Sequence, residues 1–181
     1  MPDDSREVVI RELKEAVQTL SRQMDPAIIP EVGMNIAYGL PGAREPGQVA
    51  AVEGRIVRLS GKVHPVGDVA FGASDHVARI VITAIRFDPL VRCAANIRYS
   101  DEAIGILEDM LLEICTFDRA VEPPGVKTMD WGVASCCRQG VPDVIYDLGA
   151  VGKEAMIRIL GENPDGVVKN ILKLSARMSK E

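Results

Sequence analysis

The chain has 181 residues, of which 47% are hydrophobic and 4% aromatic, and its formal net charge is −5. A chain of this length can bury the core of one domain without structural metals or disulfides. Its acidic balance argues against a nucleic-acid partner, because nucleic-acid binders normally present a basic face. No apolar run reaches the roughly 18 residues of a membrane span, and the start "MPDDSREVVI" lacks a signal-peptide core. We therefore expect no membrane partner and a cytoplasmic location.

The N-terminal segment, residues 1–26, is expected to form one amphipathic helix. A helix-turn-helix DNA reader needs at least two helices, and only one fits before Pro26. We assign this helix to the same unit as residues 27–175 and expect residues 176–181 to form a fraying tail. The apolar residues at helical spacing are Val9, Leu13, Val17, Leu20 and Met24.

The next part of the chain is expected to be extended, with turns. Residues 32–39 favour a strand, and residues 40–48 form a loop rich in Pro and Gly. Residues 54–67 predict a β-hairpin that turns at Ser60-Gly61. Residues 67–74 should be a second loop. The hairpin implies a sheet that is at least partly antiparallel.

From residue 76 onward, predicted helices and strands follow one another. This pattern is typical of an α/β domain in which helices cover a sheet. Helices are expected at 76–87, 101–113, 128–138 and 164–174, and strands at 93–99, 114–119, 142–147 and 155–160.

The four cysteines do not predict a metal site, because none of them forms a CxxC pair. We expect them to be buried small apolar residues. Oxidation of the adjacent pair stays open at this stage. The cysteines are Cys93, Cys115, Cys136 and Cys137.

The stretch "FGASDHVAR", residues 71–79, is the first candidate for an anion site. Ser74 or Asp75 should cap the helix that begins at His76, and free N–H groups at a helix start attract anions. Gly72 and Ala73 are small enough for a phosphate to approach the backbone. The alternative is an ordinary helix start with a surface or core histidine.

The stretch "LGAVGKE", residues 148–154, is the second candidate. Gly149, Gly152 and Lys153 follow Asp147 at the end of a strand, which resembles an anion-binding or metal-phosphate arrangement. It is not a P-loop, because the GxxxxGK[ST] spacing is absent. A turn with a solvated lysine is the alternative.

Charged residues on strands are the third signal. Arg55, Arg58 and Arg98 must each face solvent, a carboxylate or a ligand anion. Asp118 and Arg119 close the strand at 114–119, where ligand sites in α/β proteins tend to form. Trp131 could stack on a flat ring or pack in the core. The residues alone predict a binder of a small phosphorylated ligand.

Several longer runs add to this reading: "IPEVGMNIAYGLPGA", "VEGRIVRLSGKVHPVG", "FGASDHVARIVITAIRFDP", "NIRYSDE", "TFDR", "TMDWG", "GVPDVIYDLGAVGKE" and "MIRILG".

On these runs, between residues 28 and 174, the chain resembles the ThiN family of archaeal-type thiamine-phosphate synthases. Such domains often form the C-terminal half of a bifunctional protein that begins with a hydroxymethylpyrimidine kinase. The resemblance implies a three-layer α/β/α sandwich with a mixed sheet, similar to the N-terminal type of class II aldolase. It also implies that hydroxymethylpyrimidine diphosphate and a thiazole phosphate are joined to give thiamine monophosphate and pyrophosphate.

The resemblance further implies site residues and a cofactor. Arg55 and His76 match the essential pair of the family, and Mg²⁺ is the expected cofactor. Asp118 and Asp147 are the candidate metal ligands from their position at strand ends. A homodimer is the default assembly. The alternative function is a non-catalytic thiamine-phosphate sensor that lacks its DNA-binding partner. Candidate substrate-binding residues are Gly72, Ala73, Ser74, Asp75, Arg98, Gly149, Gly152 and Lys153.

Overall fold

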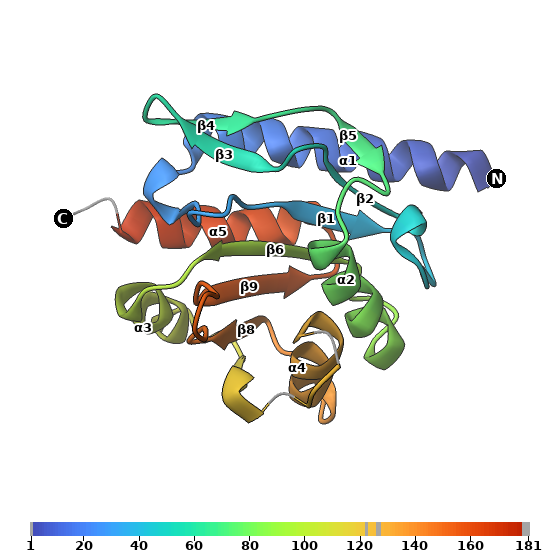
Figure 1. Cartoon of the computed structure of the whole chain (residues 1–181). Coiled ribbons are helices and arrows are strands. Elements are labelled where there is room, and N and C mark those ends of the chain that lie inside the picture. Colours follow the sequence, from blue (N-terminus) through green and yellow to red (C-terminus); the bar gives the residue numbers. More distant parts are fainter. Residues whose placement is uncertain (1, 122, 126–127, 179–181) are drawn as a thin grey trace.

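The computed structural model describes residues 2–121, 123–125 and 128–178, and its centre is a mixed sheet of seven strands (Figure 1). The strands are β1 (Ile36–Gly39), β2 (Val49–Val52), β5 (Val69–Phe71), β6 (Cys93–Arg98), β7 (Ile114–Thr116), β8 (Val144–Asp147) and β9 (Met156–Gly161). Their order is β5-β2-β1-β6-β9-β8-β7. Among these described strands β7 and β8 pair in parallel, and the other neighbours are antiparallel.

Helices cover both faces of the sheet and complete the predicted three-layer sandwich. α1 (Pro2–Gln23), α3 (Asp101–Asp109) and α5 (Pro164–Met178) pack on one face, whereas α2 (His76–Phe87) and α4 (Thr128–Cys137) lie on the other (Figure 1). Side chains that alternate along β6 divide between the two cores: Ala95 and Ile97 face the first, and Ala94 faces the second. No helix in the described ranges is long and apolar enough to cross a membrane.

Local sequence signals predicted several elements well. The apolar stripe of residues 9–24 is buried along α1, which packs on β1 and α5. α2 has the predicted bounds, and Ser100 caps α3 by accepting a hydrogen bond from the N–H of Ala103 at 3.0 Å. The predicted hairpin is present as β3 (Ile56–Leu59) and β4 (Lys62–Pro65), with positive φ at Ser60 and Gly61.

Other predictions were wrong. The β3–β4 hairpin forms a separate two-stranded sheet, so it does not supply the antiparallel pairs of the main sheet. Those pairs are β1–β2, β1–β6, β2–β5, β6–β9 and β8–β9. Residues 69–71, predicted as loop, form β5, and β2 was not predicted at all. β2 reads "VAAV" and is wholly buried, so it shows no apolar–polar alternation. The last helix continues past its predicted end near Leu174 to Met178, so residues 176–178 are helical in this structure.

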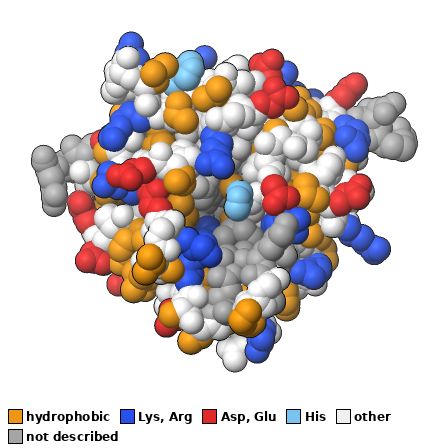
Figure 2. Space-filling model, in the orientation of Figure 1, with side chains coloured by type: hydrophobic (Ala, Val, Ile, Leu, Met, Phe, Trp, Pro, Cys, Tyr) orange, Lys and Arg blue, Asp and Glu red, His pale blue; other side chains and the backbone are white. Residues whose placement is uncertain are grey.

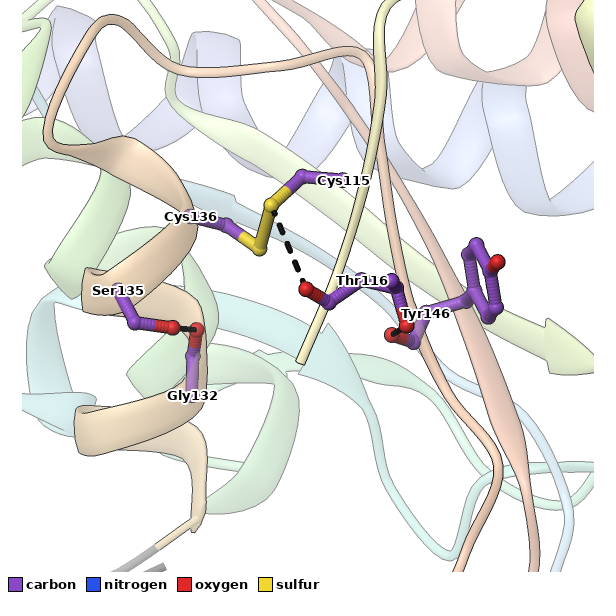
Figure 3. The surroundings of a disulfide bond; sticks show 6 residues. All are labelled: Cys115, Thr116, Gly132, Ser135, Cys136 and Tyr146. Atoms are coloured by element: carbon purple, nitrogen blue, oxygen red, sulfur yellow. Dashed lines mark hydrogen bonds between the residues drawn. A yellow bond between two sulfur atoms is a disulfide. The ribbon is translucent and has the colours of Figure 1, made fainter. Parts of the chain in front are cut away.

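The cysteines only partly follow the prediction. Cys93 and Cys137 are buried free thiols, as expected, and burial raises the pKa of Cys137 to about 11. Cys115 and Cys136 instead form a disulfide that joins β7 to α4, with their Cα atoms 5.8 Å apart (Figure 3). The pair is 21 residues apart in sequence, so the packing of α4 beside an edge strand, and no local spacing, brings it together.

Candidate functional site

A pocket of about 460 Å³ opens on the α2 side of the sheet, beside the first turn of α2. Figure 2 shows a hollow near the centre of this face, with a histidine and Lys or Arg side chains at its margin. Segments far apart in the sequence meet here. The lining residues are Val32, Gly33, Met34, Asn35, Arg55, Ala73, Ser74, Asp75, His76, Val77, Ile80, Asn96, Arg119, Gly152, Lys153, Glu154, Met156 and Arg158.

The start of α2, which the sequence predicted as an anion site, forms one wall of the pocket. Ser74 is the residue that caps it, because its Oγ accepts a hydrogen bond from the N–H of Val77 at 3.3 Å. The Asp75 carboxylate instead pairs with Arg79 one turn later, at 3.0 Å. His76 is exposed and lines the pocket. Gly72 does not line it but turns the chain after β5, with φ +78°.

Arg55 lies at the pocket rim in a strained backbone conformation. It precedes β3 and has φ 71°, a left-handed region that residues other than glycine rarely occupy. Its Nη1 donates a hydrogen bond to the carbonyl of Val32 at 2.6 Å, which holds the guanidinium against the pocket wall. Backbone strain of this kind clusters at functional sites. Arg58, on β3, is exposed and lies outside the pocket lining.

The loop between β8 and β9 forms another wall. Gly152 and Lys153 line the pocket, whereas Gly149 shapes the loop: its φ is +78°, and a Cβ there would lie 2.5 Å from the carbonyl oxygen of Lys153. The Glu154 carboxylate accepts hydrogen bonds from the N–H groups of residues 31 and 32, at 3.1 and 3.3 Å. These bonds tie the loop to the wall that carries Arg55.

A buried ion cluster lies beneath these walls. Asp147 and Arg158 are diagonal neighbours on β8 and β9, on one face of the sheet, so a long side chain can reach across. Arg158 Nη2 donates to Asp147 Oδ2 at 2.8 Å, and Arg119 Nη1 lies 3.7 Å from Asp147 Oδ1. Burial lowers the pKa of Arg158, and the charge of Asp147 opposes that effect. Asp147 therefore serves as the counter-ion of two arginines, and its role as a metal ligand stays a prediction.

Each of the two arginines has one buried nitrogen atom without a hydrogen-bond partner among the described residues. Within the described residues, Arg158 Nη1 and Arg119 Nε are buried and have no hydrogen-bond partner. Two guanidinium groups share one carboxylate, so the cluster carries a net positive charge at the pocket. This arrangement suits an anionic ligand.

Sequence reasoning missed this cluster in part. Arg119 was noticed at a strand end, but Arg158 was overlooked although it interrupts the apolar run "MIRILG", the signal that drew attention to Arg55. Asn35 and Asn96 also line the pocket without having been predicted. Arg98 was predicted to bind substrate, but it is exposed at the end of β6 and lies outside the pocket lining.

The remaining surfaces of the pocket are apolar. The exposed Val32 and the half-buried Met156 contribute them, which provides room for uncharged rings between the charged groups, whereas the lining residues Met34 and Ile80 are buried in the two cores. Trp131 does not contribute: it packs edge-on against Phe117 at 6.1 Å in the second core, which confirms the core alternative for this residue.

The described residues contain no ready-made carboxylate cage for Mg²⁺. They contain no group of three or more His, Cys, Asp or Glu side chains that could hold a metal. Asp118 Oδ1 accepts a hydrogen bond from the N–H of Ala120 at 2.8 Å, and the carboxylates of Asp75, Asp147 and Glu154 have the partners given above. Mg²⁺ itself stays a prediction from the resemblance.

Comparison with known proteins decides the family. The model of the family described as thiamine-phosphate synthase ThiN matches residues 12–173. The chain belongs to the ThiN family. It is 36% identical over 173 residues to the thiamine-phosphate synthase ThiN of Methanothermobacter thermautotrophicus, and the match covers 91% of each chain. It is 44% identical over 170 residues to the bifunctional thiamine biosynthesis protein ThiDN of Methanocaldococcus jannaschii.

The extent of these matches differs. The match to the bifunctional relative covers 92% of this chain but 40% of that protein. A crystal structure of the C-terminal domain of a phosphomethylpyrimidine kinase is 41% identical, with a TM-score of 0.87 over 93% of this chain and 99% of that one. A sugar-phosphate aldolase from Thermotoga maritima is 10% identical, with a TM-score of 0.52 over 96% of each chain. This likeness confirms the predicted aldolase-type fold for this ThiN family member.

Proposed function

We propose that this pocket makes thiamine monophosphate by joining hydroxymethylpyrimidine diphosphate to a thiazole phosphate, with release of pyrophosphate. The chain is a thiamine-phosphate synthase of the ThiN type. The observation that supports this pocket as the site is the convergence of Arg55, His76 and Lys153, from three separate segments, on one cavity with apolar walls.

The chemistry requires stabilisation of a leaving group and alignment of two substrates. The bond between the pyrimidine methylene and the diphosphate oxygen breaks, and its electron pair leaves with the diphosphate. The lone pair of the thiazole nitrogen then forms the new C–N bond to the cation-like methylene. Holding both rings in line contributes much of such an acceleration, and Val32 and Met156 offer apolar surfaces for that purpose.

The rim groups match the charge that develops on the diphosphate. Arg55, Lys153 and the start of α2 present positive charge or N–H groups where the leaving group would lie. His76 in the first helical turn would donate a hydrogen bond or a proton to the leaving oxygen. Because the described residues offer no carboxylate cluster, we propose that Mg²⁺ enters bound to the diphosphate.

The test is a two-substrate assay with purified protein and Mg²⁺. Thiamine monophosphate and pyrophosphate should form in equal amounts. His76→Ala should reduce turnover by about 10²- to 10⁴-fold, whereas His64→Ala, at an exposed position on β4 outside the pocket lining, should not. Tight binding of thiamine monophosphate without any turnover would instead support the sensor function. Equal activity of the two histidine variants would refute the role of His76.

A further inference from the structure

We propose that Arg119 and Arg158, positioned by Asp147, form a separate subsite for the phosphate monoester of the thiazole substrate. This inference rests on the proposed function and deepens it. It divides the cations of the pocket into two sets. The rim set, which is Arg55, His76 and Lys153, receives the diphosphate, and the buried pair, Arg119 and Arg158, holds the monoester.

The buried pair has the donors that such a subsite needs. The Arg158 side chain is 2% exposed, lines the pocket, and among the described residues has no partner for Nη1. Arg119 also lines the pocket, and its side chain is 12% exposed. Its Nε likewise has no hydrogen-bond partner among the described residues. Leaving a buried charged donor unsatisfied is costly. A ligand oxygen within hydrogen-bond distance of either nitrogen would remove that cost.

The pair is also held in place from several sides. Each oxygen of Asp147 has a partner besides Arg119: Oδ2 accepts from Arg158, and Oδ1 accepts from the N–H of Gly149 at 2.8 Å. The guanidinium of Arg158 lies 5.3 Å from the centre of the Phe117 ring. A fixed pair of planar guanidinium groups suits bidentate contacts to phosphate oxygens. Asp147 acts as a positioning residue, since its carboxylate orients the arginines and contributes no donor.

Burial distinguishes the two sets of cations. Arg55, His76 and Lys153 are exposed at the rim, where a leaving group can depart into solvent. The monoester phosphate is not released in the reaction, because it stays on the product. A buried and rigid pair therefore fits the monoester better than the diphosphate. The cluster of two arginines and one carboxylate has one net positive charge, which would neutralise half of the charge of a phosphate dianion.

The decisive experiment measures the KM for each substrate separately in Arg119→Gln and in Arg158→Lys. The lysine keeps the positive charge but lacks the planar guanidinium group. The KM for thiazole phosphate should rise about 10- to 100-fold, with little change in the KM for the pyrimidine diphosphate. The preference for thiazole phosphate over the thiazole alcohol should fall by the same factor. Arg86→Gln, at an exposed arginine of α2 outside the pocket lining, is the matched control and should change neither KM.

Two results would overturn the inference: a rise in the diphosphate KM alone, or unchanged KM values for both substrates. Calorimetric binding of thiazole phosphate to the same variants needs no turnover. It therefore separates the two proposals: a wild-type chain that binds thiazole phosphate through Arg119 but makes no product would refute the proposed function and keep the subsite. If Arg158→Lys does not fold, Arg119→Gln alone decides, because its side chain reaches solvent.

Discussion

Removal of the Asp147 carboxylate should destabilise the fold far more than removal of an exposed carboxylate with the same geometry. Asp147 is 0% exposed, and its partner Arg158 is 2% exposed, at 2.8 Å. Asp147→Ala leaves a buried guanidinium without its counter-ion, which typically costs about 3–5 kcal/mol of unfolding free energy. This is a large part of the roughly 5–15 kcal/mol that stabilises a typical domain.

The matched control is Asp165→Ala. Asp165 pairs with Lys169 at the same 2.8 Å, but the two side chains are 76% and 68% exposed. Solvent screens such a pair, so its loss should have little measurable effect. Equilibrium unfolding in urea, followed by circular dichroism, compares the two variants directly.

A double variant tests the cause. Asp147→Leu combined with Arg158→Met removes both charges of the 2.8 Å pair and leaves only the partly exposed Arg119, so its unfolding free energy should recover much of the loss seen in Asp147→Ala. If the two positions instead contribute additively, or if Asp147→Ala loses no more than Asp165→Ala, the counter-ion reasoning is refuted. The double variant should also lose its selectivity for the phosphorylated thiazole.

Two further predictions concern the frame of the pocket. Cys136→Ser removes a cross-link that spans 21 residues, so the unfolding free energy should fall by about 3 kcal/mol in the chain-entropy description. A reductant should lower the urea midpoint of the wild type but not of the variant. A wild type that the reductant leaves unchanged would contradict this prediction. Gly149→Ala should destabilise more than Gly152→Ala, because both positions have positive φ but only the first Cβ would meet backbone atoms. Equal urea midpoints for the two alanine variants would show that the predicted clash is relieved.

The site shows which functional residues can be predicted from short stretches of sequence and which cannot. His76 and Lys153 were predicted because a helix start and a glycine loop are recognisable from a few neighbouring residues, and both line the pocket. Asp147 was recognised as a strand-end carboxylate, but its partner Arg158 was not considered. Their contact depends on the antiparallel register of β8 and β9, a pairing that no short stretch encodes.

The sequence by itself determined the elements with strong local periodicity or turn chemistry, such as α1, α2 and the Ser60-Gly61 hairpin, and its motifs indicated the family. Only the tertiary structure decided that β2 and β5 join the sheet, that Cys115 meets Cys136, and that two arginines share Asp147. The physical reason is the range of the interactions. Helix and turn preferences act over a few residues, whereas strand pairing, disulfide formation and buried ion pairs depend on groups that folding brings together from distant parts of the chain.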